Sequence, residues 1–307
     1  MNKSSYLILL AGIILLGFGC GQGVKDGTQY TYYENGNMKD EVTYSHGVKN
    51  GKFRTYNEDG LVLSEGINQD GQVGETRYEY YVDGRVRTKV DYIGGKRNGP
   101  SLAYYSSGSL QTERIYKDDK VEGIAKTYSI NGLVELEQTY VNNELQGITR
   151  EYADGQLHLE KMYVNDKLNG VTKEYSQNGK LFAERSFKDD VLDGSSKQFD
   201  KDGNPTQEDI YQSGEIIMHH EFYADGTLMR ENALENGRTN GTKEYYPKGA
   251  LMREVKTKDG RPSQVLEYYE NGSVMYKKQY SNTGVLLRAE QYDAQGNFLN
   301  DQVYSQE

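Results

Sequence analysis

Turn-forming glycines recur along the chain at intervals of 23 or 24 residues, and this spacing limits the fold more than any other feature of the sequence. Each glycine closes the pattern Tyr-x-x-Asn/Asp-Gly or a near variant of it. The twelve positions are Gly36, Gly60, Gly84, Gly108, Gly132, Gly155, Gly179, Gly203, Gly226, Gly249, Gly272 and Gly296. A fixed period of this length is typical of proteins in which small units stack on their neighbours. The sequence therefore predicts a repeat array over residues 27–307.

A second set of turn residues lies eleven positions after most of these glycines. Every occupant is Gly, Asn or Asp, the residues that tolerate a left-handed backbone: Gly47, Gly71, Gly95, Asp119, Asn143, Asp166, Asp190, Gly214, Gly237 and Gly260, with Gly284 one residue late. At the first set, Asn-Gly and Asp-Gly indicate tight hairpin turns in which both central residues have positive φ. Each repeat is therefore predicted to be a β-hairpin with strands of about six residues.

Aromatic and acidic side chains keep fixed offsets from the repeat glycine. Aromatic residues stand four before it, as at Tyr56, and eight after it, as at Tyr44, whereas a glutamate stands five after it, as at Glu41. Because alternate residues of a strand point to opposite faces, even and odd offsets predict one aromatic face and one acidic face. The expected fold class is all-β: an elongated, single-layer antiparallel β-meander of about twelve hairpin repeats. Almost no helix is expected after the first twenty residues.

Residues 1–19 have the features of an export signal. A basic start precedes an apolar run from Leu7 to Phe18, which is shorter than the roughly 20 apolar residues that a membrane span needs. The single cysteine follows, and Gly17-Phe18-Gly19-Cys20 resembles the lipobox of bacterial lipoproteins, although Leu16 stands one place too early. The resemblance implies acylation of Cys20, with an ordinary signal peptide as the alternative. Residues 20–26 would form a short tether between the membrane anchor and the repeats.

The repeat itself resembles the bacterial MORN-repeat variant family. The likeness is carried by Tyr32-Tyr33-Glu34-Asn35-Gly36-Asn37-Met38-Lys39, and by an inner glycine that first occurs at Gly51. Gly99, Gly123, Gly147, Gly170, Gly194 and Gly241 take the place of Gly51 in later repeats, whereas Met218, Gln264 and Arg288 occupy or adjoin it in three others. The resemblance implies a scaffold for protein or lipid contact. Bacterial members are often labelled as antitoxins, a role that fits poorly with export. A rival resemblance, carried by Tyr292-Asp293-Ala294-Gln295-Gly296, is to the Tyr-Asp repeats of large secreted shell proteins. The recurring glutamate and the inner glycine fit the MORN variant better.

Composition and motifs argue against several classes of function. The net charge is −10, and no cluster of Lys or Arg forms a basic stripe, so no nucleic-acid partner is expected. The four histidines lack further ligands at metal-binding spacing, and the adjacent His219 and His220 should point to opposite faces of a strand. We find no paired nucleophile and base, and no glycine-rich loop before a helix. The chain is therefore expected to be no enzyme and to carry no cofactor or metal.

These observations predict a lipid-anchored repeat scaffold for protein–protein interaction at the bacterial cell envelope, facing outside the cytoplasm. The expected partner is an unidentified protein or glycan, and the membrane would be reached through the acyl anchor. The alternatives are an antitoxin or immunity protein that neutralises a toxin by binding it, and a glycan-binding protein that uses exposed tyrosines. The candidate binding residues are Tyr80, Tyr104, Glu113, Glu137, Glu160 and Glu184. The glutamates could instead serve only to solvate the sheet, and the tyrosines only to pack it.

Overall fold

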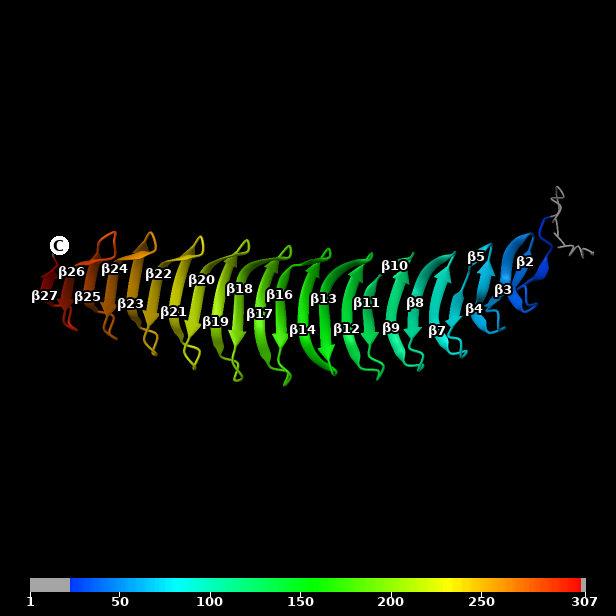
Figure 1. Cartoon of the computed structure of the whole chain (residues 1–307), viewed down its shortest axis with the longest axis horizontal. Helices are drawn as coiled ribbons and strands as arrows, with labels where there is room; N and C mark the ends of the chain where they lie inside the picture. The colour runs from blue at the N-terminus through cyan, green and yellow to red at the C-terminus, as the bar shows by residue number, and fades with distance from the viewer. Residues whose placement is uncertain (1–22, 305–307) are drawn as a thin grey trace, which may run out of the picture. The chain divides into compact units, whose positions relative to one another are not determined.

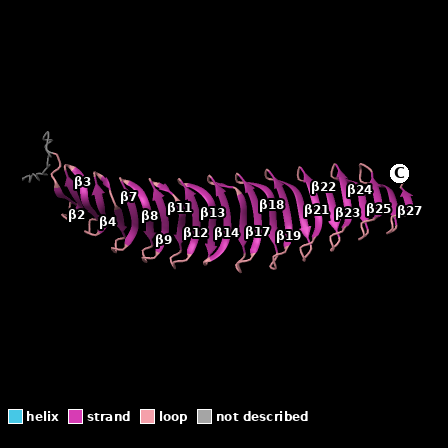
Figure 2. Cartoon of the chain, turned by 180° about the vertical axis from the view of Figure 1, so that it is seen from behind, coloured by secondary structure: helices cyan, strands magenta, loops and turns pink. Residues whose placement is uncertain are grey.

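The computed structural model describes residues 23–304, which form 27 β-strands and no helix (Figure 2). The predicted all-β class is therefore confirmed. The expected signal segment 1–19 and Cys20 lie outside the described residues. Within the described part of the chain, no helix has the length and apolar character that a membrane span requires. Residue contacts divide the chain into two compact units, residues 23–86 with 92–96 and residues 87–91 with 97–304.

Six strands belong to the first unit: β1 (Gly27–Tyr32), β2 (Met38–Ser45), β3 (Val48–Tyr56), β4 (Val62–Gln69), β5 (Gln72–Val73) and β6 (Thr76–Tyr80). Residues of both units occur in β7 (Val86–Ile93) and β8 (Lys96–Tyr104). The second unit continues with β9 (Leu110–Lys117), β10 (Lys120–Val121), β11 (Gly123–Tyr128), β12 (Val134–Val141), β13 (Glu144–Ala153), β14 (Gln156–Val164), β15 (Lys167–Leu168), β16 (Gly170–Tyr175), β17 (Leu181–Lys188), β18 (Val191–Phe199), β19 (Pro205–Gln212), β20 (Glu215–Phe222), β21 (Leu228–Glu235), β22 (Arg238–Tyr245), β23 (Leu251–Lys258), β24 (Arg261–Tyr268), β25 (Val274–Tyr280), β26 (Leu286–Tyr292) and β27 (Phe298–Val303).

Consecutive strands pair in antiparallel fashion within each unit (Figure 1). The two-residue strands β5, β10 and β15 begin the second strand of a hairpin, and an unpaired residue or two separates each from the longer strand that follows. Each repeat thus contributes two strands joined by a tight turn and linked to the next repeat by another. This arrangement is the hairpin meander that the repeat predicted.

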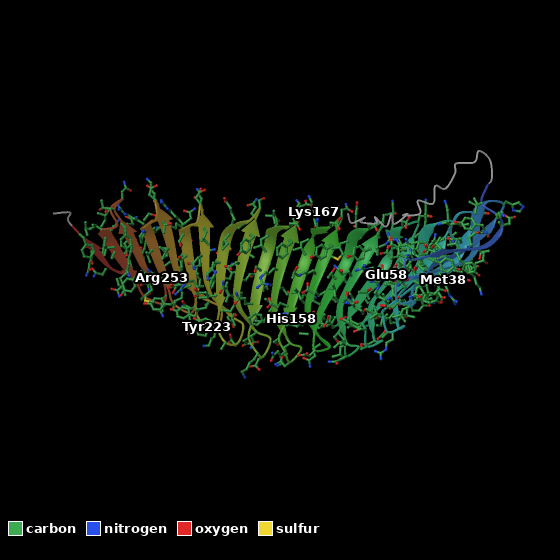
Figure 3. All side chains as sticks on the ribbon, turned by 45° about the vertical axis from the view of Figure 1, so that its right-hand side comes forward. Met38, Glu58, His158, Lys167, Tyr223 and Arg253 are labelled. Atoms are coloured by element: carbon green, nitrogen blue, oxygen red, sulfur yellow. The ribbon has the colours of Figure 1, made fainter. Side chains whose placement is uncertain are left out.

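Each unit is a single layer with almost no buried core. Side chains stand on both faces of the strands, and nothing among residues 23–304 covers either face with a second layer (Figure 3). The buried apolar side chains of the described residues are Tyr116, Ala125, Ala183, Val255 and Val265. The turns at the two edges of the sheet, where successive strands are connected, are of different types. Lys167 flanks a two-residue turn at one edge, whereas Tyr223 begins a glycine turn at the other (Figure 3).

The first set of turns differs from the prediction at eleven of its twelve glycines. At Gly36 only the glycine has positive φ, its amide donates to the carbonyl of Tyr33 (3.0 Å), and the amide of Tyr33 donates to the carbonyl of Asn37 (2.8 Å). This is a three-residue loop that ends in a glycine bulge, not a two-residue turn. The exception is Asp154-Gly155, where both residues have positive φ and the loop is one residue shorter.

The second set of turns has the geometry expected of the first. At ten positions the turn residue and its predecessor both have positive φ, as in His46-Gly47 (52° and 75°) and Asn142-Asn143 (54° and 78°). Short polar side chains tolerate this backbone, which explains why these positions hold Gly, Asn or Asp. Gly284, one residue late in the sequence, closes a glycine-bulge loop instead, and the longer loop accounts for the delay.

The inner glycines that have positive φ form wide bulges in the second strand of the hairpin. Gly51 has a φ of 116°, and it lies between the pairs Val42↔Phe53 and Tyr44↔Lys49, where three residues of β3 (50–52) oppose the single residue Thr43 of β2. Where the inner glycine is replaced, the bulge is narrower: Ile210 pairs with Met218 and Tyr211 with Ile216, so only one residue is extra. The bulge beside Gly241 is equally narrow. The narrower bulge needs no positive φ and shortens the repeat by one residue.

The prediction of one aromatic and one acidic face is wrong, and a bulge after the first turn is the reason. Tyr32 pairs with Met38 but Thr31 pairs with Asp40, so one extra residue shifts the alternation. Glu41 therefore lies on the same face as the tyrosines four residues before each glycine, and the hydroxyl of Tyr56 donates to it (3.2 Å). We call this the glutamate face. The reverse face carries the aromatics eight residues after the glycine: Tyr44, Tyr92, Tyr116, Tyr140, Tyr163, Phe187, Tyr211 and Tyr280.

Tyrosines at the glycine-turn edge connect each repeat to the next. The hydroxyl of Tyr105 donates to the carbonyl of Tyr128 (2.7 Å), and the hydroxyl of Tyr246 donates to the carbonyl of Tyr268 (2.7 Å). The same bond is made by Tyr33, Tyr223 and Tyr269. These residues stand three before the turn glycine. Their hydroxyls bind carbonyls that lie 22 or 23 residues further along the chain, so adjacent repeats are held together at this edge.

Candidate interaction surface

Opposite charges are paired across neighbouring strands on the glutamate face. In the second unit, Lys126 Nζ lies 3.0 Å from Glu137, and Arg150 Nε lies 3.0 Å from Glu160. Lys173 and Glu184 are 3.9 Å apart. In the first unit, Arg54 Nε lies 2.7 Å from Glu65. Cross-strand pairs of this kind are partly exposed and stabilise a sheet only modestly. They also cancel the charge of the glutamate row.

Tyrosine hydroxyls supply further hydrogen bonds to the same carboxylates. Tyr128 donates to Glu113 (3.1 Å) and Tyr152 donates to Glu137 (3.1 Å). Tyr80 donates to Glu65 (2.7 Å). Burial of the phenol, and to a smaller extent this hydrogen bond, raise the pKa of Tyr80 to about 12. The bond from Tyr80, together with the bond from Arg54, holds the pKa of Glu65 below its ordinary value.

The structure places the predicted binding residues in this paired network. Glu113, Glu137, Glu160 and Glu184 form one row on the second unit, each beside a hydrogen-bonding or ionic partner. They are therefore not a free acidic stripe. Tyr80 belongs to the first unit, and it is half-buried with its hydroxyl bound to Glu65. Tyr104 belongs to the second unit and is also half-buried. Neither tyrosine presents an open ring to solvent.

A row of exposed apolar side chains on the glutamate face is absent from the sequence-based candidates. It consists of Ile115, Ile124, Ile148, Met162 and Val171, which are 37–52% exposed, and we call it the apolar stripe. Ile148 and Met162 are paired across β13 and β14. Val171 stands on β16, two residues before Lys173 and so on the same face.

A sequence signal for this stripe does exist. Ile124, Ile148 and Val171 all stand sixteen residues after a repeat glycine, and Ile115 and Met162 stand seven after one. Earlier repeats hold Lys52, Thr76 and Pro100 at the former position. Each of these three successive repeats has an apolar residue at one or both positions. In other repeats, Val265 stands at the former position, and Ile67 and Ile210 stand at the latter. A comparison of repeats at the two offsets would therefore find the stripe together with these residues.

The paired histidines lie on opposite faces, as predicted. His219 Nδ1 is 2.6 Å from Asp209 on the reverse face, and His220 Nδ1 is 3.1 Å from Glu208 on the glutamate face. His220 occupies the row that holds Lys or Arg in other repeats, such as Lys197 and Lys243. Across residues 23–304 there is no group of three His, Cys, Asp or Glu side chains arranged to hold a metal ion.

Together, the hairpin repeats, the single layer and the exposed stripe define a β-repeat scaffold protein, because the architecture offers a broad surface and little interior. The family model of the MORN repeat variant matches residues 25–46, 97–118, 168–189 and 264–282. The chain therefore contains MORN-variant repeats at four places in the array. Such repeats provide a scaffold for protein or membrane interaction. A comparison with curated proteins found no match.

Two solved structures align with most of the chain at low similarity. One is a Tc holotoxin pore of Photorhabdus luminescens with a mutated TccC3: 15% identity, 90% of this chain and 16% of that chain covered, TM-score 0.21. The other is the crystal structure of TcdB2-TccC3-Cdc42: 13% identity, 89% of this chain and 15% of that chain covered, TM-score 0.19. The chain thus spans about one sixth of the length of either. At these scores, neither likeness supports a conclusion about this protein.

Proposed function

We propose that the protein is a protein-binding scaffold at the bacterial cell envelope, and that its apolar stripe contacts the partner. The observation that carries this proposal is the exposure of five aligned apolar side chains, Ile115, Ile124, Ile148, Met162 and Val171. Soluble surfaces commonly carry isolated apolar residues, whereas aligned ones mark sites of association. A strip of this kind fits a partner that presents an apolar ridge.

The rows of charged side chains beside the apolar stripe are suited to form the rim of such an interface. Lys126–Glu137 and Arg150–Glu160 are paired within the protein and partly exposed, so they need no partner charge to balance them. Interfaces typically have an apolar centre and a polar, solvated edge. Specificity would come from the spacing of the apolar side chains along the strands, and the rim would exclude partners with unmatched charge.

Replacing two central residues of the stripe tests the proposal. The double variant Ile124→Thr, Ile148→Thr should lower partner binding by at least about tenfold, because each buried isoleucine stabilises an interface by about 1.5 kcal/mol or more. The sheet should persist, since Thr139 already occupies the equivalent place on β12. The measurement is quantitative cross-linking in intact cells, followed by affinity measurement with the partner identified.

The matched control is Ile130→Thr. Ile130 is 58% exposed but lies in a glycine turn, away from the stripe. This variant should bind the partner with unchanged affinity. Equal losses in both variants, or no loss in either, would contradict the role of the stripe. If the captured partner is a toxin whose activity falls on binding, the protein is an antitoxin, as the family resemblance implies.

We also propose that the scaffold is held at the membrane by lipid attached to Cys20. The support is the sequence before the repeats: an apolar segment that ends in Gly19-Cys20, followed by a polar stretch and the first strand at Gly27. A single acyl chain binds membranes only marginally, whereas several attached chains anchor stably.

The variant Cys20→Ala is expected to shift the protein from the detergent phase to the aqueous phase in phase partitioning. It should also abolish incorporation of labelled fatty acid. The variant Cys20→Ser serves as a second test, since it keeps the size of the side chain but removes the thiol. Unchanged partitioning in both variants would show that the membrane anchor lies elsewhere or does not exist.

A further inference from the structure

A polar cleft of about 390 Å³ lies on the reverse face of the first unit. Its volume falls within the ~300–1,000 Å³ that is usual for small-molecule sites. The lining groups that carry the argument are Tyr44, Lys49, Phe53, Asn68 and Arg77. Two aromatic rings and several hydrogen-bonding side chains therefore meet in one hollow.

The cleft exists because one repeat departs from the pattern of the array. Asn68 stands eight residues after Gly60, at the position that holds Tyr44, Tyr92 and Tyr116 in the neighbouring repeats. A short amide in place of a tyrosine ring leaves space in the aromatic row. Arg77 is a second departure, because Ser101, Ala125, Thr149, Thr172 and Ser196 occupy its place in later repeats.

A third departure fixes the orientation of an aromatic ring. Phe53 occupies the same repeat position as Arg77, and its ring lies against Gly66, which stands where other repeats carry a side chain such as Val42 or Arg114. A Cβ added to Gly66 would lie 2.8 Å from Phe53 Cε1 and 3.1 Å from Cζ. Only glycine therefore leaves room for this ring. Phe53 and Gly66 act as a matched pair that holds a flat apolar surface in the cleft.

One buried polar atom of the cleft is left without a partner in the described part of the chain. Arg77 Nε is buried and has no hydrogen-bond partner, although Nη2 of the same side chain lies 3.3 Å from Glu79. Asn68, which is only 7% exposed, lines the cleft beside it. By contrast, Ser64 and Thr55 are hydrogen-bonded to each other (2.8 Å). Buried polar groups without partners are costly, so such groups facing a cleft indicate a polar ligand.

We infer that this cleft binds one neutral pyranose unit of a polysaccharide. The amide of Asn68 and the guanidinium of Arg77 offer the planar donors and acceptors that adjacent sugar hydroxyls require, and Phe53 or Tyr44 offers a ring for the apolar face of the sugar. Asp40 lines the same cleft as Lys49, and Arg77 Nη2 forms an ion pair with Glu79, so the lining carries charges of both signs and does not select an anion. The inference does not depend on the apolar stripe, which belongs to the second unit.

The test uses the full-length chain and saturation-transfer NMR. The probes are methyl glycosides of glucose, galactose, mannose and N-acetylglucosamine, the polymers dextran, galactan and mannan, and chitin oligosaccharides. Inorganic phosphate is a separate probe for an anion site. At least one glycoside is expected to bind and to compete with its own polymer. The variants Asn68→Tyr and Arg77→Ser should each weaken binding by at least about tenfold.

Both variants restore residues that other repeats carry, so each should keep the sheet, as circular dichroism would show. Tyr128→Phe is the control, because the Tyr128 hydroxyl lies on the glutamate face of the second unit and donates to Glu113; this variant should leave sugar affinity unchanged. The inference is overturned if no glycoside gives a signal, if both pocket variants bind as well as the parent chain, or if phosphate binds in place of the sugars.

Discussion

A fragment that contains a single repeat, residues 123–146, is expected to be unfolded in water, whereas a fragment of residues 123–245 is expected to fold. The longer fragment contains strands β11 to β22 of the second unit. The single repeat should lose its structure completely: it should show neither the circular-dichroism signal of a β-sheet nor a cooperative unfolding transition. The reason is that a hairpin of this protein buries almost nothing by itself.

The buried side chains and the hydrogen bonds support this expectation. Among the described residues, few apolar side chains are buried, and those of the second unit are spread over strands from different repeats. In addition, the hydroxyl of Tyr105 reaches the carbonyl of Tyr128, and the hydroxyl of Tyr152 reaches Glu137. These bonds join residues 23 and 15 positions apart, and both are lost when residues 123–146 are isolated. A lone two-stranded hairpin is at best marginally stable.

Far-ultraviolet circular dichroism and urea titration of fragments of increasing length provide the measurement. Stability should rise with each added repeat, because every addition creates one more inter-repeat contact surface. A reversed-sequence peptide of residues 123–146 is a suitable control for the unfolded spectrum. A cooperative melt of the single repeat would show that its fold does not depend on neighbours.

Much of the fold could be predicted from the sequence because the turns are local. A residue that tolerates positive φ is needed at Gly36 and at Gly47 whatever surrounds them, so their spacing shows where strands begin and end. The all-β class, the number of strands per repeat and the position of the turns follow from that spacing. These three features can be predicted without knowing which side chains are in contact in the folded protein.

The distribution of side chains between the two faces could not be obtained in the same way. One extra residue after the turn at Gly36 moves Glu41 from the expected face to the other. A bulge leaves only a weak trace in a single repeat, because it changes the pairing of strands and not the residue types. The assignment of a tight two-residue turn to Gly36 failed for a related reason, since Asn-Gly also suits a loop in which only the glycine has positive φ.

The candidate sites depend on departures from the repeat more than on the repeat itself. Asn68 and Gly66 matter because neighbouring repeats hold larger side chains at these positions, and Phe53 is fixed by the space that Gly66 leaves. In the same way, Ile124 and Ile148 matter because earlier repeats hold polar residues or proline there. The residue types that the repeats share are those that fold the array. Functional residues are better sought where one repeat departs from the shared residue type and the sheet still forms.

The variant Gly51→Ala is expected to lower the local free energy of unfolding by about 2–4 kcal/mol, the largest effect of any single substitution proposed for this protein. Two costs add. The φ of 116° at Gly51 is a conformation that side chains of L-residues rarely adopt, and a Cβ there would lie 3.0 Å from both Cβ and Cγ2 of Thr43. Thr43 is held in β2 by its pairing with Thr28 in β1, which limits the movement that could relieve the contact.

Gly241→Ala is the matched control, because Gly241 holds the same position in a later repeat but has no positive φ. A Cβ at Gly241 would meet only the carbonyl oxygen of Val255, at an ordinary 3.5 Å. Alanine should therefore be tolerated there, or even stabilise the strand by a few tenths of a kcal/mol up to about 1 kcal/mol. Native-state hydrogen exchange of the β2–β3 and β21–β22 amides measures each effect locally. Equal losses at the two sites would contradict the destabilising effect assigned to the positive φ of Gly51 and to the contact with Thr43.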